Sequence, residues 1–165
     1  MQKTILSEIY SNGGILAVEA GIKDLGSIDL NKELGNACMR GYVELAKLLI
    51  EQGANNFNSG LWCACDYGKV DAAKLMIENG ATEFSFGLAC ACYSGDIETI
   101  TLMIENGAND WNWGLCLACA KGNVDAAKLM IEKGATNFDQ GLDSALSGKQ
   151  NDTIELMNEY VVQKS

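Results

Sequence analysis

The sequence predicts an all-α protein, an α-solenoid of about six stacked helix-turn-helix repeats. The first observation is a fixed spacing, because the dipeptide Gly-Ala recurs at 53–54, 80–81, 107–108 and 134–135. The second is that segments 70–78 and 124–132 are identical, both reading VDAAKLMIE. Self-similarity at a fixed period, here about 27 residues, is the signature of repeat architectures. A single pair of short helices cannot bury its apolar side, so the pairs must stack.

The period divides the chain into repeats within one domain, residues 1–165, with starts at about 4, 31, 58, 85, 112 and 139. The residues at these starts are all good helix N-caps, so we expect each to begin a first helix. They are Thr4, Asn31, Asn58, Ser85, Asn112 and Asp139. The first and last repeats are expected to act as caps, since the last carries polar residues such as Asn151 and Asn158.

Each repeat reads as two short antiparallel helices. In the third repeat, a first helix of about two turns ends near Gly68, and a second runs from about Val70 to Asn79. Gly80 then stands where a left-handed C-terminal cap belongs.

Composition restricts the classes of function. The chain has 12 basic and 22 acidic residues and a net charge of −10, which disfavours nucleic acid and anionic membranes as partners. No apolar run approaches the roughly 18–20 residues of a membrane span. Histidine is absent, which removes the commonest general base and the commonest metal ligand. We therefore expect no enzyme, no cofactor and no metal. Seven cysteines without a secretory signal indicate a reducing compartment, the cytoplasm.

Residues 60–81, GLWCACDYGKVDAAKLMIENGA, resemble the ankyrin repeat. The resemblance is strong from Asn31 to Phe138 and weaker at both ends. The ankyrin repeat is longer, with a period of about 33 residues, and the missing part falls where that family has its β-hairpin finger. The family's Thr-Pro-Leu-His motif is also missing. The resemblance thus implies helix pairs joined by short loops. Similar short repeats are frequent in large DNA viruses, which points to a viral source and a host cytoplasm.

The cysteines are best interpreted as small core residues. Cys38, Cys65, Cys92 and Cys119 occupy the same position in successive repeats, which we call a column. Adjacent helices lie about 8–10 Å apart, too far for equivalent thiols to share a zinc ion. A catalytic thiol would also need a neighbouring base, and the chain has no histidine. A metal- or thiol-based protein is therefore the least favoured alternative.

Candidate binding residues come from columns that vary between repeats. One column reads Ser59, Phe86, Trp113 and Gln140, and another contains Trp62. In ankyrin repeats, the positions just before the glycine that ends the first helix belong to the concave partner-binding surface, and the resemblance carries this role to eight further residues. The complete candidate set is Met39, Arg40, Trp62, Asp66, Tyr67, Phe86, Tyr93, Ser94, Trp113, Ala120 and Lys121.

The sequence therefore predicts a non-enzymatic protein–protein interaction module. It would bind a protein partner on the concave face formed by the first helices and loops, as a monomer, with large aromatic residues as anchors. The expected anchors are Trp62, Tyr67, Tyr93 and Trp113. The alternative is a structural repeat protein that self-associates by end-to-end contact of its stacks.

Overall fold

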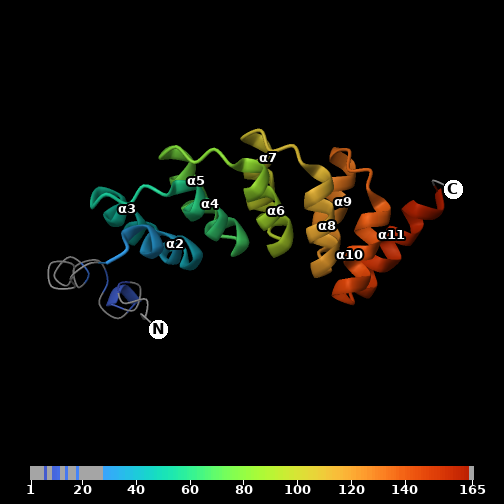
Figure 1. The fold of residues 1–165 in the computed structure, drawn as a ribbon, viewed down its shortest axis with the longest axis horizontal. Coiled ribbons are helices and arrows are strands. Elements are labelled where there is room, and N and C mark those ends of the chain that lie inside the picture. The colour runs from blue at the N-terminus through green and yellow to red at the C-terminus, as the bar shows by residue number, and fades with distance from the viewer. Residues whose placement is uncertain (1–5, 7–8, 12–13, 15–17, 19–27, 164–165) are drawn as a thin grey trace. The chain divides into compact units, whose positions relative to one another are not determined.

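The computed structural model describes Leu6, residues 9–11, Gly14, Val18 and residues 28–163. Over these residues the fold is all-α, as predicted, and contains no strand. The predicted cap at Thr4 lies outside the described residues. The helices labelled in Figure 1 are α2 (Leu30–Arg40), α3 (Val43–Glu51), α4 (Phe57–Asp66), α5 (Val70–Glu78), α6 (Phe84–Ser94), α7 (Ile97–Glu105), α8 (Trp111–Lys121), α9 (Val124–Lys133), α10 (Phe138–Gly148) and α11 (Asn151–Gln163).

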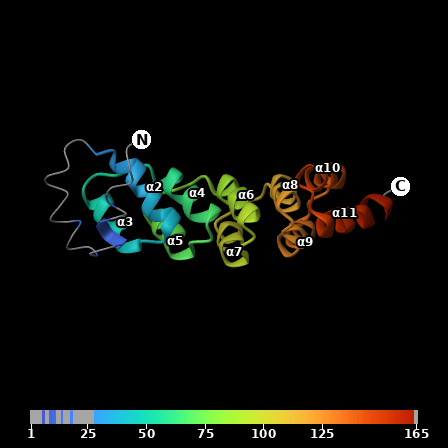
Figure 2. The same ribbon diagram turned by 90° about the horizontal axis from the view of Figure 1, so that it is seen from below.

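The chain divides into two compact units, which are described separately. The N-terminal unit comprises Met1–Ala64 and Lys69–Thr82, and the C-terminal unit comprises Cys65–Gly68 and Glu83–Ser165. In the C-terminal unit each repeat is a helix pair, α6 with α7, α8 with α9 and α10 with α11. First helices α6, α8 and α10 pack side by side in one layer, and second helices α7, α9 and α11 form the other (Figures 1 and 2).

Glycines end the helices at the positions that the sequence predicts. The first helix α8 ends at Gly122, whose φ of 77° lies in the left-handed region. Gly80, after α5, has a φ of 105°, in agreement with the expected cap position. In the last repeat Lys149 takes the place of the first-helix glycine and still adopts a φ of 56°. The repeat therefore imposes this conformation even where the residue is not glycine.

The predicted N-cap column is wrong by two positions. The first helices begin at Leu30, Phe57, Phe84, Trp111 and Phe138. Their capping positions are therefore Asp29, Asn56, Glu83, Asp110 and Asn137, and Asp110 is one that accepts a hydrogen bond from a first-turn amide. The residues predicted as caps lie inside the first turn, where their side chains have a different role.

That role is to hold the next interrepeat loop. Asn112 Oδ1 accepts hydrogen bonds from the backbone N–H groups of Thr136 (2.8 Å) and Asn137 (3.0 Å). Asn31 accepts from residues 55 and 56 in the same way, and Asn58 accepts from Thr82. These side chains thus supply acceptors for backbone amides of the short loops, which form no strand among the described residues.

The core is built from columns that recur once in every repeat. Leu34, Leu61, Leu88 and Leu115 are fully buried, and so are the alanines three positions later. Cys38, Cys65, Cys92 and Cys119 are also fully buried, which confirms their interpretation as core residues.

A glycine column explains why small thiols fill those positions. A Cβ atom built on Gly114 would lie 2.7 Å from Met130 Sδ and 3.1 Å from Cys92 Sγ. Gly60, Gly87 and Gly141 are enclosed in the same way, each by a methionine of its own repeat and a cysteine of the preceding one. Within each compact unit, every such glycine therefore interlocks with one methionine and one cysteine, and a side chain added to the glycine forces these neighbours to shift.

We predict that Asn112→Ala lowers the free energy of unfolding by about 1 kcal/mol, because two loop amides lose their acceptor. Ser85 occupies the same column, but its hydroxyl is 3.4 Å from Asn109 N. Ser85→Ala should therefore cost much less, and Ser85→Asn should stabilise the protein by about 0.5 kcal/mol. Urea unfolding followed by circular dichroism measures all three. Equal midpoints for Asn112→Ala and Ser85→Ala would contradict the loop-holding role.

Candidate functional site

The first helices α6 and α8 present a continuous apolar surface to solvent. On α6, Phe86, Cys90 and Tyr93 are spaced i, i+4, i+7 and lie on one side of the helix. On α8 the residues in the same columns are Trp113, Leu117 and Ala120. All six are at least partly exposed, whereas Gly87, Leu88 and Ala89 on the other sides of α6 are buried. We call these six residues the α6–α8 face.

The aromatic members of the α6–α8 face carry exposed rings. Phe86 and Trp113 each expose 38% of their surface, and Tyr93 exposes 40%. Each ring thus leaves more than a third of its surface in solvent, although large aromatic side chains are usually placed where they bury as much area as the fold allows. Core packing alone does not explain this shared exposure on adjacent helices.

Two contacts fix these rings in place. Phe86 and Trp113 meet edge to face, with ring centroids 5.3 Å apart and an interplanar angle of 71°. Lys121 Nζ lies 4.2 Å from the centroid of the Tyr93 ring, in a cation–π arrangement. Both contacts join α6 to α8, so the face is held as one surface by its own side chains.

The same columns are polar in the next helix along. On α10 they are Gln140, Ser144 and Ser147. The repeat folds with either kind of residue there, since α10 packs on α8 as α6 does. The apolar character of the α6–α8 face is therefore not required for stacking.

Five of the predicted binding residues come together in the C-terminal unit. Four of them, Phe86, Tyr93, Trp113 and Ala120, belong to the α6–α8 face, and Lys121 borders it. Ser94 lies next to Tyr93, but its hydroxyl shares its proton between the carbonyl oxygens of Cys65 (3.0 Å) and Ala91 (2.9 Å).

The remaining predicted residues lie elsewhere. Asp66 is the last residue of α4 and is half-buried, and Tyr67 in the turn after it is 51% exposed. In the N-terminal unit, Arg40 ends α2 and is exposed, while Met39 and Trp62 are half-buried.

Two residues of the α6–α8 face, Cys90 and Leu117, are absent from the set that the sequence predicts. Their column, which also contains Cys63, has the composition of core filler, yet both are partly exposed in the middle of the face. The spacing contains the signal, because each lies four positions after one aromatic candidate and three before the next candidate.

Burial controls the chemistry of the thiols. All seven cysteines are present as thiols. Burial raises the pKa of Cys92 from 9.0 to about 12, and it raises those of Cys38 and Cys119 to about 12 with a smaller contribution from a neighbouring cysteine. These groups stay protonated at neutral pH and are poor nucleophiles and poor metal ligands. Among the described residues, no three Cys, Asp or Glu side chains are grouped as a metal site.

Tandem helix pairs in a fixed register, with short loops, define a helical-repeat protein of the α-solenoid class. The family model for ankyrin repeats, in three copies, matches residues 34–112. This segment is thus made of ankyrin repeats, which confirms the resemblance found in the sequence, and α8 to α11 continue the same register beyond it. The search of curated proteins found no match. Within the described part of the chain, the helices are too short or too polar to cross a membrane.

We predict two classes of thiol reactivity. In the native protein at pH 8, the half-buried Cys63 and Cys90 should react with a disulfide reagent much faster than the buried cysteines, because the latter are shielded and protonated. In the urea-unfolded protein, all seven cysteines should react with the reagent at one rate. The Cys63→Ser/Cys90→Ser variant should lose the fast phase, and a fast phase that persists in it would contradict the assigned burial.

We also predict a loss of stability at alkaline pH. A thiol whose pKa is higher in the folded state than in the unfolded state contributes to the free energy of unfolding. This contribution is complete below pH 9 and declines as the pH rises towards 12. Replacing Cys92 by Ala removes one such thiol, so the decline above pH 9 should become shallower by about 1.4 kcal/mol per pH unit. Urea midpoints of wild type and Cys92→Ala between about pH 8 and pH 11 measure this difference. Parallel curves would show that burial does not raise this pKa.

Proposed function

We propose that this chain is a non-enzymatic protein-binding module whose α6–α8 face receives an apolar segment of a partner protein. Ankyrin repeats are generally protein–protein interaction modules. The observation that carries the finer proposal is that α6 and α8 have apolar residues both on their buried sides and on one exposed side.

A helix that is apolar all round is normally buried on all sides. Here the buried sides of α6 and α8 already form the stack, through Leu88 and Leu115 and the columns beside them. The exposed side is thus available for contact with another molecule, and exposed apolar patches of this kind typically mark interaction sites. The polar equivalents on α10 limit the proposed site to α6 and α8 in this unit.

The contacts within the face favour binding. The Phe86–Trp113 pair and the Lys121–Tyr93 pair restrict the rotamers of four side chains before a partner arrives. Less side-chain entropy is then lost on association, and a larger share of the burial energy appears as affinity. Aromatic and cationic side chains are also the residues that dominate binding energy at interfaces.

Charges at the two ends of the face define the partner further. Glu83 and Asp110 lie at the N-terminal ends of α6 and α8, and Lys121 lies at the C-terminal end of α8. A complementary partner segment has apolar side chains in the middle, a basic residue towards Glu83 and Asp110, and an acidic residue towards Lys121. No nucleic acid is proposed as partner, because the net charge of −10 opposes it.

The proposed setting is a reducing compartment, the cytoplasm of the cell or host in which the protein acts. Cys38, Cys92 and Cys119 are buried thiols between repeats, and an oxidised bridge would require the helices to move. We propose no cofactor, since the interrepeat space is filled by the glycine, methionine and cysteine columns.

We predict that Phe86→Ala/Tyr93→Ala/Trp113→Ala abolishes capture of the partner, with a loss of at least about 100-fold in affinity. The side chains are exposed, so the fold should persist, as far-UV circular dichroism would show. Partners captured from the native cell by the wild-type chain would be identified by mass spectrometry and then titrated against each variant. Adding Trp62→Ala and Tyr67→Ala tests whether the remaining predicted anchors contribute.

The matched control is Ile97→Ala on α7. Ile97 is 40% exposed, as much as the three aromatic residues, but it lies on a second helix. The control should bind the partner with unchanged affinity. If the triple variant binds as the wild type does, the partner does not use the α6–α8 face.

A further inference from the structure

The last helix pair, α10 and α11, carries exposed apolar residues in columns that are buried in every preceding repeat of this unit. Leu146 on α10 is 53% exposed and Val162 on α11 is 74% exposed. Their counterparts one repeat earlier, Cys119 and Ala135, are 0% and 2% exposed because α10 and α11 pack over that repeat.

The substitutions in these columns enlarge the apolar surface of α10 and α11. Leu146 replaces Cys119, Ile154 replaces Ala127 and Val162 replaces Ala135, each with a larger apolar side chain. Asn151 and Asn158 are polar replacements, for Val124 and Ile131, so the surface is apolar only in part.

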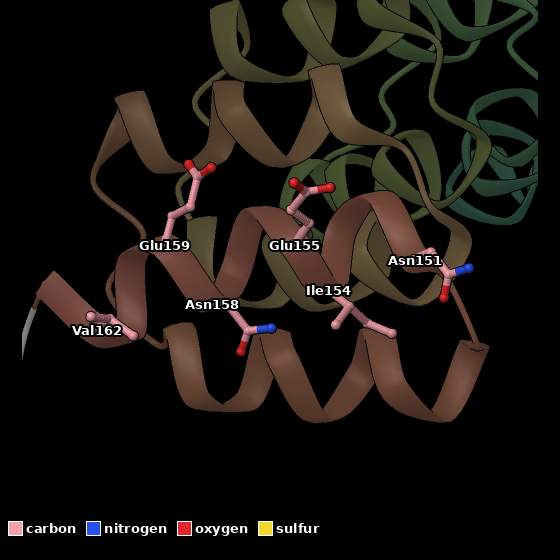
Figure 3. Close-up of a pocket in the computed structure, with 6 residues that line it drawn as sticks. All are labelled: Asn151, Ile154, Glu155, Asn158, Glu159 and Val162. Carbon is pink, nitrogen blue, oxygen red and sulfur yellow. The ribbon is translucent and has the colours of Figure 1, made fainter.

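A shallow groove, widely open to solvent and with a volume of about 620 Å³, lies along α11. It is lined by Asn151, Ile154, Glu155, Asn158, Glu159 and Val162 (Figure 3). In Figure 3, Glu155 and Glu159 project together from one side of the helix, and Ile154 and Asn158 project from the other. The groove thus has two apolar residues, Ile154 and Val162, and a pair of carboxylates among its lining residues.

The outer stripe of the second helices is most acidic in this repeat, since on α7 it reads Glu98, Thr101 and Glu105. On α9 the outer stripe reads Asp125, Lys128 and Glu132, whereas on α11 the same positions are Asp152, Glu155 and Glu159. All three carboxylates of α11 are exposed. Replacing the lysine by Glu155 leaves this stripe without its cation, so the stripe attracts a cationic partner.

We propose that the α10–α11 face, formed by Leu146 and the residues that line this groove, docks an amphipathic, basic helix of a partner protein. A helix fits because the equivalent side of α9 is covered by a helix, α11, in this same unit. The apolar side of the docked helix would cover Leu146, Ile154 and Val162, and its Lys or Arg residues would pair with Glu155 and Glu159. A second copy docking through this same face would set its own acidic stripe against Glu155 and Glu159, which like-charge repulsion opposes. This surface is separate from the α6–α8 face.

The test uses the full chain and three fluorescent synthetic helices of about four turns. One has Leu on one side and Lys on the other, the second has Glu in place of Lys, and the third is a scrambled Lys peptide. Fluorescence anisotropy should show the Lys helix binding at least about tenfold more tightly than either of the others.

Charge reversal at the groove separates a specific site from general attraction to an acidic protein. Glu155→Lys/Glu159→Lys should reverse the preference, so that the Glu helix binds more tightly than the Lys helix. The matched control, Glu105→Lys/Glu132→Lys, makes the same charge change at exposed sites on α7 and α9 and should keep the wild-type preference. Val162→Asp should weaken binding of the Lys helix about tenfold.

An equal response of the two charge-reversal variants would overturn the proposal, as would binding unaffected by Val162→Asp. Analytical ultracentrifugation of the chain alone measures whether it forms a dimer. A dimer that forms with concentration and is abolished by Val162→Asp would assign the face to a second copy, and the proposed basic helix would be wrong.

Discussion

The packing of a methionine and a cysteine against a glycine is the constraint on which the rest of this structure depends. At Gly114 the side-chain space is occupied by sulfur atoms from Met130 and Cys92, which belong to the same repeat and to the preceding one. The contact ties the two helices of a repeat to each other and to the preceding repeat in one step. It also sets how closely α6 and α8 approach, and hence how the side chains on their outer side are spaced.

The second constraint follows from the short loop. Because the period is shorter than that of the usual ankyrin repeat, the loop between repeats is short, and it contains few acceptors for its own backbone N–H groups. Asn112 and its counterparts supply them from inside the first helix. Because the loop is held by the repeat that precedes it, the stack is stabilised by polar contacts at its loop edge and by sulfur packing in its interior. Both act between nearest neighbours, as expected for a repeat protein.

The period and the composition of the sequence were enough to predict the helix pairs, the turn glycines and the buried cysteines. The position of the helix starts was not predictable, since asparagine suits a cap and also suits an acceptor for a loop amide. Only the fold decides that Asn58 reaches Thr82 rather than its own first turn. The glycines at positions such as Gly60 and Gly114 also recur with the repeat period. Their packing role depends on contact with methionines of the second helices, and the repeat spacing alone does not predict which methionine contacts which glycine.

The candidate site was predictable in part for the same reason. Phe86, Tyr93 and Trp113 stand out because they differ from their counterparts in other repeats, and the fold places them on one surface. Cys90 and Leu117 complete that surface but resemble core residues in composition, so their exposure required the structure. Because the buried sulfur contacts hold the helices together, the residues in the exposed columns are not needed for stacking. These residues can therefore vary between repeats in a way that suits contact with a partner. The chain also has a net charge of −10, and repulsion between like-charged copies opposes their association through the exposed aromatic residues.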